Sequence, residues 1–293
     1  MSPFLIRRVC ETSNAYLALG NESWQAHGAT FVRNRATPRR YDANEVGLVR
    51  TGSATEIEAL FVEIDRVYEG FGHRMISTDA LTPRAFEARL AMEDGYREEH
   101  FIVHALLDEL KASPRDVDIH EVVTEADWAA YRELDELWWR ESGESEVLFG
   151  PYDPDLHDEM MASKRAKNPM ARSWFALVDG VPRAFFSSWP GENGAGMVED
   201  LFAHPDYRRH GLGTALIAHC VADARARGAG PVLITSNVGD TPKHMYAAMG
   251  FRPLYVLRTW TKKLSNPNSR AGTARGWAGS WPPFIRSTCR LFF

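Results

Sequence analysis

The sequence has little cysteine and no long apolar run. Its three cysteines, Cys10, Cys220 and Cys289, are far apart and show neither the CxxC spacing of a metal or redox site nor the density of a disulfide framework. No apolar stretch approaches the roughly 20 residues of a bilayer-spanning helix, and Met1–Cys10 lacks the pattern of a secretion signal. These absences predict a cytoplasmic protein with reduced thiols.

Positive charge is also scarce. The net charge is −5, so the chain lacks the overall positive field that drives binding to phosphate backbones. Neither nucleic acid nor a membrane is expected as a partner, and the composition leaves the oligomeric state open. The 293 residues are 44% hydrophobic, which is enough for two cores in domains of roughly 100–150 residues each.

The second half of the chain alternates between strand-like and helix-like apolar patterns. Its expected elements are a strand at 118–124, helices at 125–142 and 155–167, strands at 173–178, 182–189 and 197–203, a helix at 213–227, a strand at 231–236, a helix at 242–249 and a strand at 251–260. Asp179-Gly180 is a hairpin turn signal, and the later strand-helix-strand order requires a crossover. Together they predict an α/β fold with a mixed sheet flanked by helices.

The first half of the chain shows, less clearly, the same alternation of strands and helices that ends the second half. Its expected elements are strands at 45–49, 75–78 and 101–106 with helices at 55–69 and 83–93. We therefore expect two tandem copies, with an N-terminal domain at 1–112, a second domain at 113–263 and a flexible tail at 264–293. An unrelated α/β domain in the first half is the alternative.

One loop is suited to binding an anion. Residues 207–214 lie between a predicted strand and an amphipathic helix, and Gly211 and Gly213 let the backbone approach a pyrophosphate at the helix N-terminus. A dinucleotide fingerprint would need a third glycine where Leu216 stands, and a P-loop would need a Lys-Ser/Thr pair that this loop lacks. A plain tight turn into the helix is the other interpretation.

These residues resemble the GCN5-related N-acetyltransferase (GNAT) superfamily. The resemblance rests on Arg208-x-x-Gly211-x-Gly213, on the strand that ends before Pro205, and on Tyr246-x-x-x-Gly250-Phe251, and it covers about residues 118–263. The two-copy layout resembles tandem members of the superfamily. In the first copy the loop at 50–54 lacks the second glycine and is followed by Glu56 and Glu58, and Ala91 stands where the second copy has Tyr246. The first copy is therefore expected to be degenerate.

The resemblance implies that acetyl-CoA is the acyl donor. The backbone of the strand at Leu201, Phe202 and Ala203 would hold the pantetheine arm, because an unpaired strand edge can bind an extended amide. The pyrophosphate would be held by the residues of the loop, namely Arg208, Arg209, His210, Gly211, Leu212, Gly213 and Thr214. Asn237 would hydrogen-bond the cofactor arm or, equally, cap the following turn.

Two residues are candidates for proton transfer. Tyr246 occupies the family position of the acid that protonates the leaving thiolate, and a phenol stays protonated at pH 7. Glu199 lies near the position of a glutamate base in some members, and alternation along its strand predicts that it shares a face with Met197, Leu201 and Ala203 while Asp200 points to the opposite face. A structural tyrosine and a solvent-facing or cation-binding carboxylate are the alternatives.

The acceptor is the least determined part of the prediction. Acidic residues in the segment that would form the acceptor wall suggest a cationic amine, although solvated loop charge explains them too; they are Glu144, Glu146, Asp153, Asp155, Asp158 and Glu159. Aromatic residues of the same segment would line the acceptor pocket or belong to the core; they are Trp138, Trp139, Phe149 and Tyr152. The sequence thus predicts an N-acetyltransferase that acylates a primary amine of a small molecule or peptide directly, without a metal. A non-catalytic acyl-CoA-binding module and a structural or partner-binding protein are the alternatives.

Overall fold

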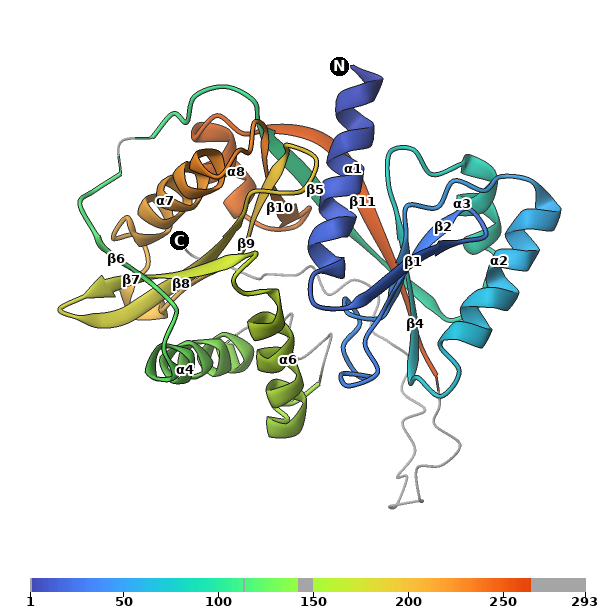
Figure 1. The fold of residues 1–293 in the computed structure, drawn as a ribbon, viewed down its shortest axis with the longest axis horizontal. Helices are drawn as coiled ribbons and strands as arrows, with labels where there is room; N and C mark the ends of the chain where they lie inside the picture. Colours follow the sequence, from blue (N-terminus) through green and yellow to red (C-terminus); the bar gives the residue numbers. More distant parts are fainter. Residues whose placement is uncertain (1, 113, 142–149, 265–293) are drawn as a thin grey trace.

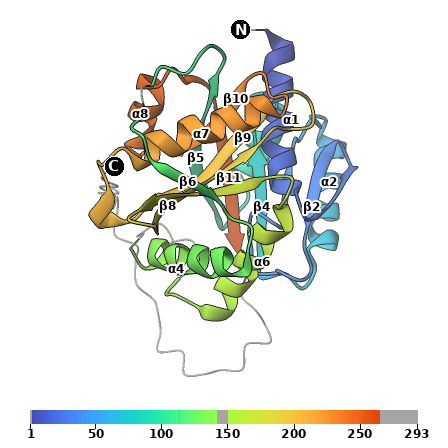
Figure 2. The same cartoon turned by 60° about the vertical axis from the view of Figure 1, so that its left-hand side comes forward.

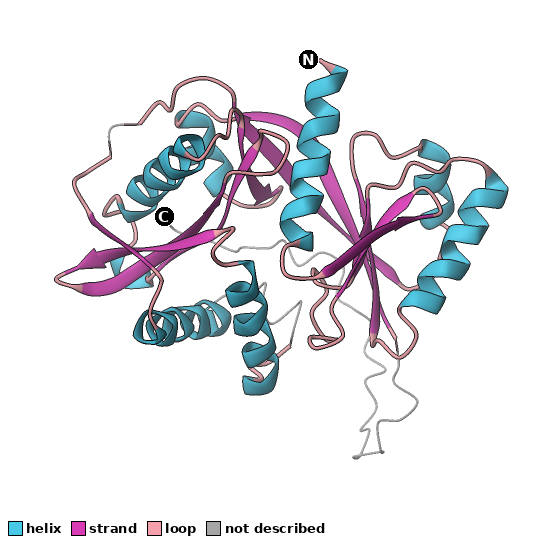
Figure 3. Cartoon of the chain, viewed as in Figure 1, coloured by secondary structure: helices cyan, strands magenta, loops and turns pink. Residues whose placement is uncertain are grey.

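One mixed sheet runs through the whole protein. The computed structural model describes residues 2–112, 114–141 and 150–264. Within these ranges, eleven strands form a single sheet in the order β1-β2-β3-β4-β11-β5-β10-β9-β8-β7-β6. Helices flank the sheet on both faces (Figures 1 and 3). The predicted fold class, a mixed α/β sheet covered by helices, is confirmed.

The N-terminal half contains more structure than its sequence pattern predicts. Its elements are α1 (Pro3–Ala18), β1 (Glu22–Ala26), β2 (Ala29–Arg33), β3 (Glu45–Gly47), α2 (Ala54–Val67), β4 (His73–Thr78), α3 (Arg84–Leu90) and β5 (Tyr96–Leu106). The elements after residue 44 were predicted, whereas α1 and the β1-β2 hairpin were missed. Helix α1 shows no clean apolar stripe because it buries Thr12, Ser13 and Asn14. The hairpin turns at His27 and Gly28, both with positive φ, which is a type I′ turn with an unusual first residue.

The C-terminal half follows the predicted order of elements. They are β6 (Asp118–Glu121), α4 (Glu125–Glu141), α6 (Pro154–Lys167), β7 (Arg172–Val178), β8 (Val181–Trp189), β9 (Gly196–Ala203), the 3₁₀ turn η1 (Pro205–Tyr207), α7 (Leu212–Ala226), β10 (Val232–Asn237), α8 (Pro242–Ala248) and β11 (Arg252–Lys263). The apolar stripe of α7, with Leu216, Ile217 and Cys220 fully buried, packs on one face of the sheet. Helices α4 and α6 lie on the other face (Figure 2).

The two halves exchange their last strands. Strand β11, from the end of the C-terminal half, pairs antiparallel with β4 and β5 of the N-terminal half. Strand β5 in turn pairs antiparallel with β10, from Val232 opposite Leu106 to Asn237 opposite Phe101. Both strands run between the two lobes in Figure 1. The domain boundary after residue 112 stays a prediction. The strands before it and the strands after it belong to one continuous sheet.

This strand exchange predicts that the two halves, expressed as separate fragments, depend on each other to fold. Fragments 1–112 and 113–293 expressed together are expected to co-purify through a tag on either one, because each supplies an inner strand of the other's sheet. Each fragment alone is expected to aggregate, since β10 or β4 would become an unpaired edge. Size-exclusion chromatography checks both outcomes, and a folded monomer of fragment 113–293 alone would contradict the coupling.

Helix α1 fills the region between the two lobes (Figure 1). Its Val9 and Tyr16 are buried in a core that also contains Val103 of β5, Met197 of β9 and Leu233 of β10. The N-terminal helix therefore covers the face of the central strands opposite α7. No helix in the described part of the chain is both long and apolar enough to span a membrane.

Candidate active site

Strands β9 and β10 begin as neighbours and then separate. They pair in parallel only where Gly196 faces Val232 and Met197 faces Leu233. Strand β9 continues to Ala203 on its other neighbour, β8, and β10 continues to Asn237 on β5. Beyond Met197, the edge of β9 toward β10 thus has no ladder partner among the described strands. Such an edge presents free N–H and C=O groups to an extended ligand.

A β-bulge lies on β9 where the separation occurs. Phe185 of β8 faces Phe202 and Ser187 faces Glu199, so Asp200 and Leu201 together oppose the single residue Phe186. Asp200 has a φ of 67°, in the left-handed region. The extra residue shifts the alternation of side chains along β9.

The bulge overturns the predicted grouping of side chains on β9. Glu199 pairs with Ser187, whereas Ala203 pairs with Ala184, three residues away on β8 and therefore on the other face. Ala203 and Leu201 pack in the core beneath α7. The prediction that Glu199 shares a face with these two residues is wrong, because simple alternation ignores the inserted residue.

Asp200 was also placed on the wrong face. Its Oδ2 lies 3.7 Å from Nζ of Lys164, a residue of α6. Asp200 therefore faces the α4 and α6 side together with Glu199, because the bulge interrupts the alternation of side chains along β9. Two carboxyl groups consequently lie side by side where β9 leaves β10.

The N-terminus of α7 is open to an anion. Its N-cap is Gly211 with a φ of 87°, no side chain caps it, and its first turn has no acidic residue. The first N–H groups of a helix have no partner within the helix, so those of Leu212, Gly213 and Thr214 are free to bind a ligand. A φ of this value favours glycine, which accounts for Gly211.

The corresponding helix in the N-terminal half is closed by its own carboxylate. Ser53 and Glu56 form a capping box at the start of α2. Glu56 Oε2 accepts hydrogen bonds from the Thr51 and Ser53 hydroxyl groups, at 3.1 and 2.6 Å. The position of an incoming phosphate is therefore taken by a negative charge, as expected for a degenerate copy.

Basic side chains lie around the α7 N-terminus. Arg208 donates from Nε to the Ala203 carbonyl at 3.1 Å, so that carbonyl already has a partner within the chain. Arg209 and His210 are exposed. Arg115, from the segment before β6, lies so close that a Cβ on Gly211 would meet its Cδ at 3.3 Å. The sequence analysis missed Arg115, since nothing in its local pattern relates it to a loop nearly one hundred residues away.

The position of Arg115 predicts that it contributes to the binding of a phosphate-bearing ligand at the α7 N-terminus. Arg115→Ala is expected to raise the KM for acetyl-CoA about fivefold and to leave kcat unchanged, because an exposed cation adds modestly to phosphate binding. The matched control is Arg66→Ala, an exposed arginine on α2. Steady-state kinetics at low and moderate salt checks the effect, and equal KM values for the two variants would remove Arg115 from the site.

Tyr246 of α8 is held in an aromatic environment that both halves build. It is 4% exposed, and its ring meets His104 of β5 edge-on at 5.9 Å between centroids. Burial raises the pKa of Tyr246, and the negative charges of Glu199 and Asp240 raise it further. The phenol therefore stays protonated at neutral pH. His104 was also missed, because only the strand exchange brings β5 beside this site.

Glu199 lies half-buried at the point of strand separation. Its Oε1 is buried and accepts no hydrogen bond from any described group. Burial raises the pKa of Glu199 to about 7, against a smaller lowering by the neighbouring Thr235 hydroxyl. A carboxyl group with this pKa can accept a proton near neutral pH.

The remaining predicted residues have mainly structural contacts. Asn237 accepts a hydrogen bond at Oδ1 from the Gly239 N–H at 2.8 Å, so it caps the turn as one alternative expected.

The acidic residues of the predicted acceptor wall form ion pairs. Asp153 and Glu159 pair with Arg39, and Asp158 pairs with Arg132. Solvated and paired loop charge thus describes these acids better than a cation site. Trp139 is 2% exposed and belongs to the core. The predictions for Glu144, Glu146 and Phe149 lie outside the described residues, as does the predicted tail from residue 265 onward.

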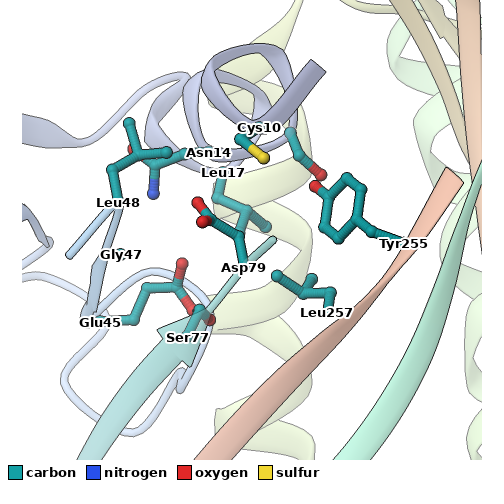
Figure 4. A pocket seen from close by; sticks show the side chains of 11 residues that line it. Cys10, Asn14, Leu17, Glu45, Gly47, Leu48, Ser77, Asp79, Tyr255 and Leu257 are labelled. Carbon is teal, nitrogen blue, oxygen red and sulfur yellow. The ribbon is translucent and has the colours of Figure 1, made fainter. Parts of the chain in front are cut away.

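The N-terminal half has a similar separation of two parallel strands, and a small cavity lies beside it. Strands β3 and β4 pair only where Val46 faces Ile76, and Leu48 follows with a positive φ of 48°. Between these strands and α1 lies a cavity of about 20 Å³, into which Glu45 and Asp79 project (Figure 4). Glu45 is fully buried, and burial raises its pKa to about 8. The two halves therefore share a backbone plan but not a set of side chains.

Comparison with known proteins agrees with this geometry. A mixed sheet whose parallel strands separate beside an uncapped helix N-terminus defines an acetyltransferase-like fold. Residues 128–251 match the model of the Acetyltransferase (GNAT) family, so this part of the chain is a GNAT domain. The predicted family resemblance is thus confirmed. No curated protein matches the chain.

Solved structures extend the similarity over both halves. A GCN5-related N-acetyltransferase from Kribbella flavida is 15% identical with a TM-score of 0.63, over 88% of this chain and 95% of that chain. A functionally unknown conserved protein from Staphylococcus epidermidis is 12% identical with a TM-score of 0.63, over 84% and 96%. A tandem GNAT protein from the clavulanic acid biosynthesis pathway is 14% identical with a TM-score of 0.52, over 76% of each chain. At these identities the matches show the fold alone.

Proposed function

We propose that the C-terminal half transfers an acetyl group from acetyl-CoA to a primary amine of a small molecule or peptide by direct attack. The observation that carries the proposal is the separation of β9 from β10 after Met197, next to the open N-terminus of α7. The pantetheine arm would pair with the free edge of β9 at Leu201 and Phe202. The pyrophosphate would lie on the backbone amides that follow His210.

The first chemical step requires a neutral amine. An alkyl amine with a pKa near 10.4 must lose a proton at a cost of about 4.6 kcal/mol at pH 7. Glu199 supports this step, because its carboxylate has no hydrogen-bond donor on Oε1 and a pKa of about 7. It would take the proton directly or through a water molecule. The amine nitrogen then bonds to the thioester carbon.

The second step expels the thiolate of CoA. As the carbon–sulfur bond breaks, Tyr246 would donate its phenolic proton to the sulfur and recover one from solvent. Support comes from its burial and from the negative charge of Glu199, both of which raise the pKa of Tyr246 and keep its phenol protonated. The products are the amide and free CoA, and no covalent enzyme intermediate is needed.

Two measurements test the proposal. Calorimetry is expected to show saturable binding of acetyl-CoA, and a panel of amines is expected to release CoA above the rate of spontaneous hydrolysis. Binding without turnover on any amine would favour the alternative, a non-catalytic acyl-CoA-binding module. No saturable heat would favour a structural or partner-binding role.

A further inference from the structure

A second cavity lies on the face of the sheet that carries Glu199 and is covered by α1 and α6. We call this face the acceptor side. The cavity is lined by Tyr16 of α1, by Lys164 and Lys167 of α6, by Ser187 of β8 and by the bulge residue Asp200. Ser187 is the ladder partner of Glu199, so the two side chains lie on the same face of the sheet. The volume of the cavity, about 10 Å³, is about that of one water molecule or one oxygen atom of a ligand.

The two lysines in this cavity differ in their counter-ions. Lys164 Nζ lies 3.1 Å from Asp135 Oδ1 and 3.7 Å from Asp200 Oδ2. Burial lowers the pKa of Lys164, but the two carboxylates outweigh it and raise the pKa overall. Lys164 is therefore a satisfied cation.

Lys167 has no such partner. It is 8% exposed, and its Nζ lies 4.1 Å from the centre of the Tyr16 ring. Its ammonium group makes no hydrogen bond and no ion pair with any group in the described part of the chain. Burial lowers the pKa of Lys167, against longer-range attraction by Asp200 and Asp42. A buried ammonium group without an adjacent anion is costly, and an anionic ligand group would stabilise it.

Two polar groups on the acceptor side thus lack a partner, and the partners that they lack are of opposite kinds. Lys167 lacks an anion, and the buried Oε1 of Glu199 lacks a donor. The charges of the two groups interact, since Lys167 lowers the pKa of Glu199. A ligand that supplies an amino group and a carboxylate on neighbouring atoms would satisfy both.

We propose that the acceptor is a free amino acid, whose carboxylate pairs with Lys167 and whose amino group lies at Glu199. This inference rests on the proposed function. One carboxylate oxygen would take the place of a water molecule in the small cavity beside Lys167, and the amino group would remain outside the cavity, toward Glu199. An amine without a carboxylate leaves Lys167 unpaired, and a site built for a polar group discriminates strongly against an analogue that lacks it.

Matched acceptor pairs test the inference. Each pair is an amino acid and the amine that remains after removal of its carboxylate, such as alanine and ethylamine, with alaninamide as the uncharged analogue. CoA release is measured with saturating acetyl-CoA. We expect kcat/KM for the amino acid to exceed that of the amine and the amide by about 50-fold or more.

Three variants identify the group responsible. Lys167→Met is expected to raise the KM for amino acids about 10–100-fold and to abolish the preference over amines, whereas Lys167→Arg keeps the preference. Lys262→Met is the matched control, because its Nζ also lies over an aromatic ring, that of Tyr96 at 5.6 Å, but where β11 pairs with β5, away from the proposed site. If Lys167→Met does not fold, the wild-type comparison decides alone.

The outcomes distinguish a failure of the amino-acid proposal from a failure of the proposed acetyl transfer. Equal or higher kcat/KM for the amines overturns the amino-acid proposal and leaves acetyl transfer standing. An unchanged preference in Lys167→Met also overturns it. Absence of turnover with every amino acid and amine contradicts the proposed function itself.

Discussion

Tyr246→Phe is expected to lower kcat by about 10²–10⁴ and to leave the KM for acetyl-CoA nearly unchanged. The substitution removes the phenolic proton that would neutralise the leaving thiolate, and general acid catalysis contributes effects of this size. The ring itself stays in place, packed against His104 and Phe251. Steady-state kinetics with thiol detection measures both constants.

A matched variant makes the result specific to the site. Tyr96→Phe removes another phenol, one that is partly buried against the core of the N-terminal half, and is expected to keep wild-type kcat. If Tyr246→Phe retains full kcat, the tyrosine is structural and another group protonates the sulfur. Circular dichroism of both variants separates loss of chemistry from loss of fold.

Glu199→Gln is expected to lower kcat/KM about 10²–10³-fold and to change the pH dependence of the reaction. The base acts as a carboxylate, and its pKa is raised to about 7. The wild-type rate should therefore fall about tenfold for each pH unit below 7 and level off above it. In the glutamine variant the break near pH 7 should disappear and kcat/KM should keep rising up to pH 9, because only the amine substrate, with a pKa near 10.4, still has to lose a proton.

The neighbouring carboxyl group provides the control. Asp200→Asn alters a residue on the same face, and it is expected to retain the limb near pH 7 whatever its effect on KM. Profiles of kcat/KM from pH 5 to 9 for the three proteins make the comparison. A levelling-off near pH 7 that persists in Glu199→Gln would assign the titration to another group.

Much of the C-terminal half is predictable because its elements depend on local patterns. The stripe of Leu216, Ile217 and Cys220 identifies α7, and Asp179-Gly180 identifies the turn between β7 and β8. Both features act over a few residues, where periodicity and backbone preference decide the outcome. The same holds for Gly211, whose positive φ is a local requirement.

The details of the site were less predictable. One inserted residue at Asp200 moves Glu199 to the face opposite Leu201, and no residue type there marks the bulge. Helix α1 was missed because it buries Thr12, Ser13 and Asn14 between the lobes, where polar contacts replace an apolar stripe. Patterns that assume one apolar face fail for an element covered on several sides.

The sequence by itself determined the order of strands and helices and the glycine loop before α7, since both follow from interactions between residues close in the chain. Only the tertiary structure decided which groups meet at the site. Strand exchange brings His104 to Tyr246, chain packing brings Arg115 to Gly211, and α1 brings the Tyr16 ring beside Lys167. These contacts join residues roughly one hundred or more positions apart, and such distances are closed by the burial of shared apolar surface, which local patterns do not encode.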